Sequence, residues 1–300
     1  MGPENRQNRA FFIAGGDRHT EPSGRAVYSG SMPHTRRSGL RIRYELTGAG
    51  PPLVLVHGYT ASGKSNWAAS GWVEHLAGRH TLVIPDLRGH GGSEKPHSSS
   101  AYSIAAMAGD VLAVMDREGI ESAPVFGYSM GGIVTLDLLL DHPARVSAAI
   151  IGGMGSYFPR GRGRFSFERQ HQQSTASRRS TVEQVKFLAS YISRFDPIAI
   201  EAAYRGVFKN GRPVDSARLR EIKVPVLVAA GDLDVFHDPA KDLAARIPGA
   251  RFISLRNEGH LSAIRNPELM VEVAAFLSEQ SAMRGLPGHH RPPSKGLRVE

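Results

Sequence analysis

Residues Val125-Phe126-Gly127-Tyr128-Ser129-Met130-Gly131-Gly132 decide how this sequence is interpreted. An apolar run over residues 122–126 meets a serine that stands between two glycines, and a second apolar run follows. This is the pattern G-x-S-x-G between a strand and a helix, which is typical of a nucleophile elbow, a sharp turn that presents a reactive serine. Gly127 and Gly131 carry no side chains, so the two segments can pack closely around Ser129. The pattern is weak by itself, and the rest of the chain must supply the partners of the serine.

The composition is that of an ordinary globular protein of one or two domains. Of the 300 residues, 41% are hydrophobic and 22% are charged. There are no cysteines, which excludes disulfides, a thiolate nucleophile and a cysteine-based metal site. No apolar run reaches the length of a membrane span, and residues 10–14 are too short for the core of a signal peptide. We therefore expect a cytoplasmic protein that uses no metal and no cofactor, and the sequence indicates no oligomeric state.

The net charge of +9 raises the question of a nucleic-acid partner. The basic residues are concentrated in the segments 1–38, 156–180 and 281–300, which hold 16 of the 37 Lys and Arg residues and only 5 of the 28 acids. The remainder of the chain is close to neutral, and no recognised nucleic-acid-binding motif accompanies the charge. Polar, basic termini of this kind are typically solvated and disordered. We expect no nucleic-acid partner, and we predict disordered tails over residues 1–38 and 281–300.

Apolar runs that alternate with helical patterns predict an α/β core. Residues 40–46 alternate between apolar and polar side chains and predict an edge strand. Residues 104–115 carry apolar side chains at a helical spacing. Continuous apolar runs are typical of strands that are buried on both faces of a parallel sheet, and they occur at 53–56, 122–126, 148–151 and 224–230. We therefore predict a mostly parallel central sheet with helices on both faces, formed by residues 39–154 and 223–280.

Residues 155–222 interrupt this alternation. They are too long for a plain crossover between two strands, and residues 181–195 and 196–208 predict two amphipathic helices that each open with a capping residue. We predict a helical cap over the active site, which would shape the substrate pocket and exclude water. Eight aromatic side chains either line an apolar pocket or hold the cap on the body: Tyr157, Phe158, Phe165, Phe167, Tyr191, Phe195, Tyr204 and Phe208.

The loop after the strand at 53–56 supports a rival hypothesis. Residues Gly58 to Ser65 satisfy G-x-x-x-x-G-K-S, the phosphate-binding P-loop, directly after a buried strand. Asp86, after the next apolar run, could then bind magnesium. Pro85 argues against this hypothesis, because a proline inside a strand removes a ladder donor, and residues 66–72 are a poor opening for the phosphate-binding helix. Nucleotide binding therefore remains the alternative from another class, together with a non-catalytic scaffold.

Five ordered motifs over about residues 40–280 resemble the α/β-hydrolase family. They are His57-Gly58-Tyr59-Thr60 with Trp67, Pro85 to Ser93, Gly127 to Gly132, Gly231-Asp-Leu-Asp234, and Asn257-Glu-Gly-His260. The resemblance implies a catalytic triad of Ser129 as nucleophile, Asp234 as acid and His260 as general base, in the chain order of that family. Asp232 is the alternative acid.

The same resemblance assigns roles to the neighbouring residues. The backbone N–H groups of Tyr59 and Met130 would form the oxyanion hole, with Gly58, Gly127 and Gly131 as the glycines of the elbow and its facing loop. Asp86 and Arg88 are expected to brace loops rather than to contact substrate. Asp137, in the apolar helix after the elbow, is expected to be a structural hydrogen-bonding residue.

A serine at the elbow argues against the family's epoxide hydrolases and haloalkane dehalogenases, which use a carboxylate nucleophile. We therefore predict a serine hydrolase that acts on a small, apolar acyl substrate, namely a carboxylic ester or a lactone. Hydrolysis of a carbon–carbon bond in a vinylogous diketone and cofactor-free perhydrolysis are the enzymatic alternatives, because one triad serves several chemistries.

Overall fold

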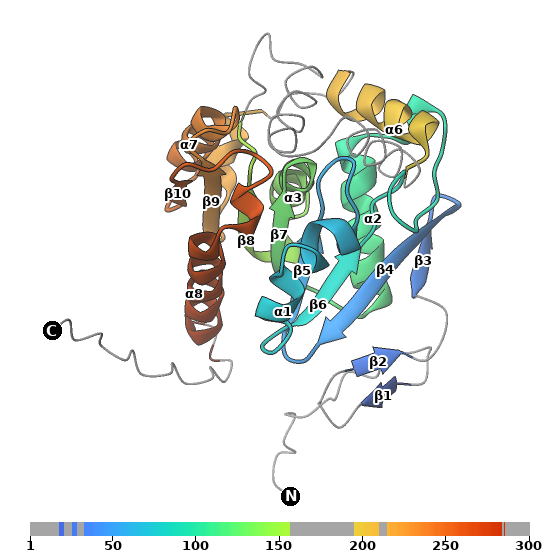
Figure 1. Ribbon diagram of the computed structural model, residues 1–300, viewed down its shortest axis with the longest axis horizontal. Coiled ribbons are helices and arrows are strands. Elements are labelled where there is room, and N and C mark those ends of the chain that lie inside the picture. Colours follow the sequence, from blue (N-terminus) through green and yellow to red (C-terminus); the bar gives the residue numbers. More distant parts are fainter. Residues whose placement is uncertain are drawn as a thin grey trace, which may run out of the picture.

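The computed structural model describes residues 18–20, 26–28, 33–156, 195–209, 215–283 and 285. Within these ranges, eight strands form one sheet in the order β10-β9-β8-β7-β5-β6-β4-β3 (Figure 1). The strand β4 pairs antiparallel with β6 and with β3, and all the other neighbours are parallel. The strands are β3 (His34–Arg37), β4 (Leu40–Gly48), β5 (Pro52–Val56), β6 (Thr81–Pro85), β7 (Ala123–Tyr128), β8 (Val146–Gly152), β9 (Val226–Gly231) and β10 (Arg251–Leu255). The mostly parallel α/β sheet predicted from the apolar runs is confirmed.

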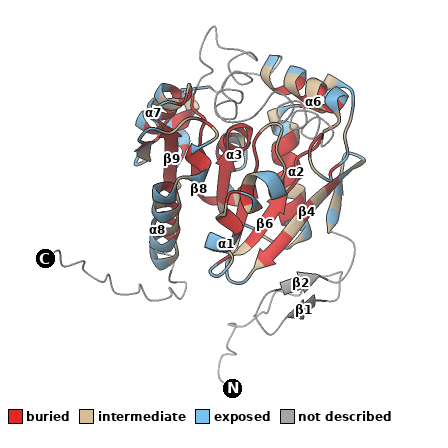
Figure 2. Ribbon diagram, in the orientation of Figure 1, coloured by how far each residue is buried: buried red, intermediate tan, exposed pale blue. Residues whose placement is uncertain are grey.

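Helices cover both faces of the sheet (Figures 1 and 2). One face packs against α2 (Ile104–Arg117), α3 (Met130–Asp141) and α7 (His237–Arg246). The other packs against α1 (Trp72–Leu76) and α8 (Pro267–Met283). Successive residues of β5 alternate between the two cores, with Val54 and Val56 in the first and Leu53 and Leu55 in the second. This double burial explains why the central strands have continuous apolar sequences.

The sheet begins inside the segment that was expected to be a tail. His34–Arg37 forms β3, which pairs antiparallel with β4, so β3 and not β4 is the edge strand on this side. The guanidinium of Arg37 lies against Gly109 of α2, where an added Cβ would be 2.0 Å from Arg37 Cζ. The prediction of a tail up to residue 38 is therefore wrong at its end, because a polar edge strand leaves no apolar pattern in the sequence. A short ribbon of β1 (Arg18–Thr20) and β2 (Ala26–Tyr28) precedes it.

Part of the predicted cap lies outside the described residues, including residues 181–194 of the helix expected at 181–195 and the aromatic residues from Tyr157 to Tyr191. The second predicted helix is present as α6 (Pro197–Tyr204), continued by the short helix η4 (Arg205–Lys209). Asp196 caps α6, since its Oδ1 accepts the N–H groups of Ile198 and Ala199 at 3.0 Å. His97 Nε2 contacts Asp196 Oδ2 at 2.8 Å, so the start of α6 is attached to the loop before α2.

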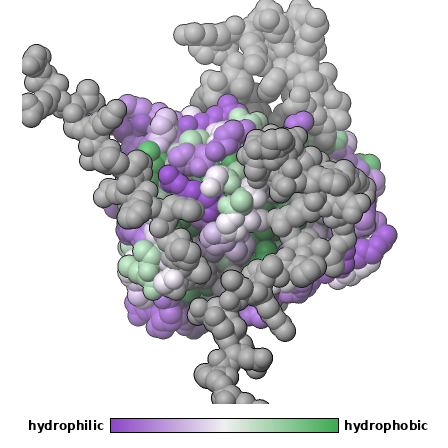
Figure 3. Space-filling view, turned by 90° about the horizontal axis from the view of Figure 1, so that it is seen from below, coloured by the Kyte–Doolittle hydropathy of each residue, from purple (hydrophilic) through white to green (hydrophobic). Residues whose placement is uncertain are grey.

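The surface of the described residues is mixed in character. Figure 3 shows one face, on which hydrophilic side chains surround small hydrophobic areas. The exposed large hydrophobic residues lie on α6, on the loop after β9 and on α8, and they are Ile198, Leu233, Val271 and Met283. Among the described residues, no helix combines the length and the apolar character that a membrane span requires.

Candidate active site

Ser129 occupies a strained turn between β7 and α3. Its φ of 56° and ψ of −119° lie in a region that L residues rarely adopt, at a cost on the order of 1–3 kcal/mol. Two hydrogen bonds fix the turn: Ser129 N–H donates to Gly152 O at 2.8 Å, and Gly132 N–H donates to Ser129 O at 2.8 Å. The surrounding structure therefore holds the serine in place against its local conformational preference.

The two flanking glycines are required by close packing. A Cβ on Gly127 would lie 2.1 Å from Gly131 O and 2.3 Å from Thr135 Oγ1. A Cβ on Gly131 would lie 2.0 Å from Val56 O, on the neighbouring strand β5. No larger residue fits at either position without displacing backbone, so close packing accounts for glycine at both.

The structure brings Ser129, His260 and Asp234 together, although 131 and 26 residues separate the bonded pairs along the chain. His260 Nε2 lies 3.0 Å from Ser129 Oγ, and His260 Nδ1 lies 2.8 Å from Asp234 Oδ2. Their exposed fractions are 6%, 3% and 5%. Each residue follows the carboxyl end of a parallel strand (β7, β9 or β10), and these ends meet at one edge of the sheet.

The acid loop after β9 distinguishes its two aspartates. Asp234 is buried and its Oδ1 accepts the Phe236 N–H at 3.0 Å, which leaves Oδ2 directed at His260. Asp232 is exposed. The nearby His237 contacts Ser254 Oγ at 2.9 Å and Asp238 Oδ1 at 3.2 Å rather than the serine of the elbow. Of the two candidate acids, only Asp234 contacts the histidine.

The loop after β5 places Gly58 against the serine, since a Cβ on Gly58 would be 3.2 Å from Ser129 Cβ. Hydrogen bonds fix the peptide groups on both sides of Gly58. Its N–H donates to Asn66 Oδ1 at 3.1 Å, and His57 Nδ1 lies 2.7 Å from its carbonyl oxygen. His57 Nε2 accepts the Leu87 N–H at 3.0 Å, so the ring proton is on Nδ1 and is donated to Gly58 O. Burial lowers the pKa of His57, which keeps the ring neutral in this arrangement.

The fixed Gly58 carbonyl determines where the next amide points. In a planar trans peptide, the C=O and the N–H point in opposite directions. The Tyr59 N–H therefore points away from His57. Met130 opens α3, where the first N–H groups have no carbonyl partner within the helix. The two predicted oxyanion donors thus follow Gly58 and Ser129 directly in the chain.

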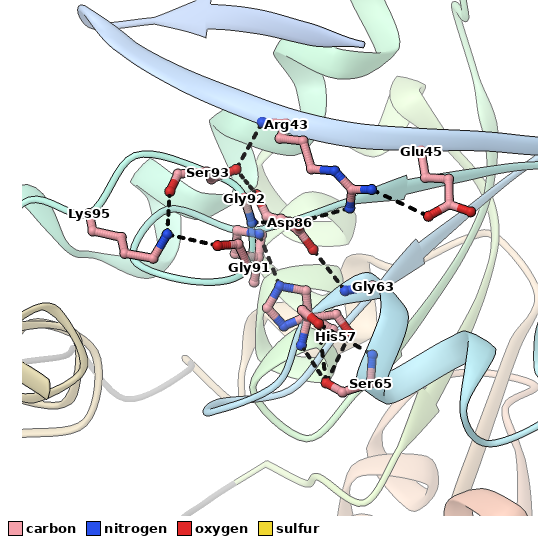
Figure 4. A network of polar contacts seen from close by, with 12 residues as sticks. Arg43, Glu45, His57, Gly63, Ser65, Asp86, Gly91, Gly92, Ser93 and Lys95 are labelled. Carbon is pink, nitrogen blue, oxygen red and sulfur yellow. Dashed lines mark hydrogen bonds and ion pairs between the residues drawn. The ribbon is translucent and has the colours of Figure 1, made fainter. Parts of the chain in front are cut away.

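Asp86 connects this loop with two other segments of the chain (Figure 4). Its Oδ1 accepts the Gly63 N–H at 2.8 Å, and its Oδ2 accepts the Gly92 N–H at 2.8 Å and Arg43 Nη1 at 2.9 Å. Burial by itself would raise the pKa of Asp86, but the Gly92 and Gly63 amides and the Arg43 guanidinium favour the charged carboxylate, and the pKa is lowered. The carboxylate is therefore a charged brace, as the sequence predicted.

Arg88 has the same kind of role. Its Nε and Nη2 donate to the two oxygens of Asp110, each at 2.6 Å, and both side chains are buried. This bidentate pair attaches the loop after β6 to α2.

The P-loop hypothesis for Gly58 to Ser65 is wrong. The amides that would cradle a phosphate already have partners, with Gly63 N–H on Asp86, Gly58 N–H on Asn66 and Ser62 N–H on Ser65 Oγ. The Asp86 carboxylate beside Gly63 would also repel a phosphate (Figure 4). Among the described residues, no group of three or more His, Cys, Asp or Glu side chains could hold a metal ion.

Tyr128 makes a contact that was not predicted from the sequence, and Asp137 differs from its prediction. Tyr128 Oη donates to His260 O at 2.6 Å, a contact that no motif could reveal because the position before the elbow serine is variable in the pattern. Asp137 was expected to be a hydrogen-bonding residue, but its buried Oδ2 has no partner. Burial, and then the nearby Asp141, raise the pKa of Asp137 to about 6.

Comparisons with known proteins identify relatives of this fold. Residues 51–159 match the family described as the alpha/beta hydrolase fold. The chain is 30% identical over 258 residues to a putative carbamate hydrolase of Caulobacter vibrioides, covering 79% of this chain and 95% of that protein. The chain covers only 33 to 63% of the length of several other curated relatives.

Solved structures of other hydrolases share this fold. An esterase from a Rhodococcus species superposes with a TM-score of 0.68 at 26% identity, over 84% of this chain and 100% of the esterase. An N-acyl homoserine lactone degrading enzyme superposes with a TM-score of 0.64 at 28% identity, over 81% of this chain and 99% of that enzyme.

Proposed function

Because the chain belongs to the α/β-hydrolase family, we propose that it is a serine hydrolase that cleaves a carboxylic ester or a lactone through an acyl-enzyme. The observation that carries the proposal is the line of hydrogen bonds from Ser129 Oγ through His260 to Asp234. A hydroxyl, an imidazole and a carboxylate in this order are the components of an activated serine nucleophile.

The first half of the reaction forms the acyl-enzyme. The Asp234 carboxylate can only accept a hydrogen bond, so it holds the ring proton of His260 on Nδ1 and leaves the Nε2 lone pair facing Ser129. As Oγ forms a bond to the substrate carbonyl carbon, Nε2 takes the hydroxyl proton and the carbonyl oxygen becomes an oxyanion. The N–H groups of Tyr59 and Met130 stabilise that oxyanion. When the tetrahedral intermediate collapses, the leaving oxygen departs with the proton from His260.

The second half repeats the sequence with water. His260 takes a proton from a water molecule as the water oxygen attacks the acyl carbon, which gives the second tetrahedral intermediate. When this intermediate collapses, the bond between the acyl carbon and Oγ breaks, His260 returns the proton to Oγ, and the acid is released. With a lactone, the alcohol and the acyl group belong to one molecule, so the product is a single hydroxy acid.

Burial of the three side chains supports this mechanism. The imidazolium that forms on His260 is adjacent to a carboxylate in surroundings with little water, and there an opposite charge stabilises it more strongly than in solvent. The strained turn at Ser129 holds Oγ at this position before substrate arrives, so less reorganisation is needed in the reaction.

The choice of an ester or lactone rests on two structural relatives above 25% identity, an esterase and a lactone-degrading enzyme. A carbamate is the second candidate, because the curated relative that the chain covers almost completely is a putative carbamate hydrolase. Both substrates present an acyl carbon to the serine and differ in the group attached to it.

The test uses a fluorophosphonate probe and p-nitrophenyl acyl esters. We expect stoichiometric labelling at Ser129 and ester cleavage, and we expect Ser129→Ala to lose both while keeping the thermal unfolding midpoint. Lys64→Ala, on the exposed part of the facing loop, is the control and should retain activity. An unlabelled, folded wild type, or activity that depends on Lys64 instead of Ser129, would contradict the proposal.

A further inference from the structure

Tyr128 links the serine of the elbow to the histidine. It is the last residue of β7 and directly precedes Ser129. Its side chain is 3% exposed, and its hydroxyl donates to the backbone carbonyl of His260 at 2.6 Å. One residue therefore fixes the nucleophile through the chain and the base through a buried hydrogen bond.

The end of β8 leaves space for this contact. A Cβ on Gly152 would be 2.6 Å from Tyr128 Cδ2. A Cβ on Gly153 would be 3.0 Å from Tyr128 Cζ and 3.2 Å from His260 Cε1. Side chains at these two positions would push the tyrosine ring and the imidazole out of place, so the absence of side chains here makes room for both rings.

The imidazole of His260 also contacts two aromatic rings. The Tyr128 ring lies 5.7 Å away at 50°, and the Phe236 ring lies 5.5 Å away at 49°. Phe236 stands two residues after Asp234 and donates its N–H to that carboxylate. The residue before Ser129 and the residue two positions after Asp234 therefore both place an aromatic ring against the imidazole of His260.

The segment that carries His260 has no helix or strand between the end of β10 at Leu255 and the short helix η6 (Ala263–Arg265). Such a segment depends on individual contacts for its position. The Leu233 N–H donates to Glu258 O at 3.0 Å and ties the segment to the acid loop. The Tyr128 hydroxyl attaches the same segment to the residue directly before the nucleophile Ser129.

We propose that Tyr128 is a positioning residue that sets the distance between Ser129 Oγ and His260 Nε2. The proposal rests on the hydrolase function proposed above. Without the hydroxyl, the His260 carbonyl loses this buried hydrogen bond and the segment loses its attachment to the residue before the nucleophile, so the segment can shift. A shift of the segment carries the imidazole with it, and proton transfer between Oγ and Nε2 depends steeply on their alignment.

Tyr128→Phe tests the proposal, with Tyr102→Phe as a matched control. Both tyrosines are 2–3% exposed, and each hydroxyl donates to a backbone carbonyl at 2.6 Å, His260 O for one and Pro96 O for the other. Both variants therefore remove a hydrogen bond from a tyrosine hydroxyl to a backbone carbonyl, and the Tyr128 hydroxyl has a further backbone contact at Ile264. Only Tyr128 contacts the histidine.

We expect both variants to lose a similar amount of thermal stability. Only Tyr128→Phe should lower kcat for a p-nitrophenyl ester, by about tenfold, and slow fluorophosphonate labelling of Ser129 by a similar factor. The KM should stay within about twofold, since the hydroxyl faces the base and not the substrate. A merely structural hydroxyl would lower stability without this separation of kcat from KM.

Wild-type kcat in Tyr128→Phe, or an equal loss of kcat in both variants, overturns the inference and leaves the hydrolase function intact. If Tyr128→Phe does not fold, Tyr128→His takes its place, because the shorter imidazole does not reach the His260 carbonyl and should show the same loss of kcat. A wild type that is folded but not labelled at Ser129 overturns the hydrolase proposal, and this inference with it.

Discussion

The hydroxyl of Tyr59 donates to the backbone carbonyl of Ile200 at 2.9 Å, so the loop after β5 is attached directly to α6, a helix of the predicted cap. The Tyr59 ring also packs edge-on against Phe208 at 5.4 Å and lies 6.5 Å from Tyr204. The residue whose N–H is the proposed oxyanion donor thus contacts, through its side chain, the part of the predicted cap that the structure describes. The proposed stabilisation of the oxyanion and the substrate binding predicted for the cap would therefore meet at one residue.

Tyr59→Phe separates these two roles, because it removes the hydroxyl and keeps the backbone N–H. We expect the KM for long-chain p-nitrophenyl esters to rise by about three- to tenfold, which corresponds to the loss of one hydrogen bond. The kcat for p-nitrophenyl acetate should stay within about twofold. Steady-state kinetics over a series of acyl chain lengths measures this, and an equal fall of kcat for all chain lengths would contradict it.

The buried pair of Arg88 and Asp110 should be among the strongest single contributions to stability. Their side chains are 5% and 0% exposed, so Asp110→Ala leaves a buried guanidinium without its partner. We expect the free energy of unfolding to fall by about 3–5 kcal/mol in urea titrations. The exposed pair of Arg145 and Asp116, at 25% and 64% exposure, is the control, and Asp116→Ala should cost about 1 kcal/mol or less. If the two variants lost similar amounts of unfolding free energy, burial would not be the cause of the loss in Asp110→Ala.

Asp137 should make stability depend on pH. Its carboxyl ionises near the ordinary value of 3.8 in the unfolded chain, whereas burial raises its pKa to about 6 in the folded chain. Between these values the folded state binds more protons, so stability falls as the pH rises through this window, and the loss is complete above pH 6.

Asp137→Asn removes this titration. At pH 8 we expect the free energy of unfolding to rise by about 1 kcal/mol, less than the full shift would give because the side chain is partly exposed and solvent screens its charge. At pH 3 the variant and the wild type should be equal. Urea unfolding at the two pH values checks this, and an equal change at both would refute it.

Gly131 should tolerate no side chain, because a Cβ there would lie 2.0 Å from Val56 O. We expect Gly131→Ala to lower the free energy of unfolding by about 1–3 kcal/mol or more through overpacking. Labelling of Ser129 should fall with it. Gly78→Ala is the matched control, because no atom lies within 4 Å of a Cβ at that position. Thermal melting and probe labelling of both variants decide whether packing at the elbow is responsible.

Much of the core could be predicted because its signals are local. The apolar runs over residues 53–56 and 148–151 lie within β5 and β8, and the helical spacing over 104–115 lies within α2. Burial on both faces of a parallel sheet leaves continuous apolar sequences, and one-sided burial of a helix leaves a periodic one. The strand β3 left no such signal, because its side chains are exposed or half-buried.

The elbow glycines, the order of the candidate residues Ser129, Asp234 and His260, and the bracing role of Asp86 could be predicted from motifs in the sequence. The folded chain was needed to show that Asp234 rather than Asp232 contacts the histidine, that the amides of the loop around Gly63 already have partners, and that Tyr128 reaches His260 O. The two kinds of information differ in their range along the chain. Close packing and burial leave patterns in neighbouring residues, whereas a hydrogen bond between groups 26 or more positions apart exists only once the sheet has brought its strand ends together.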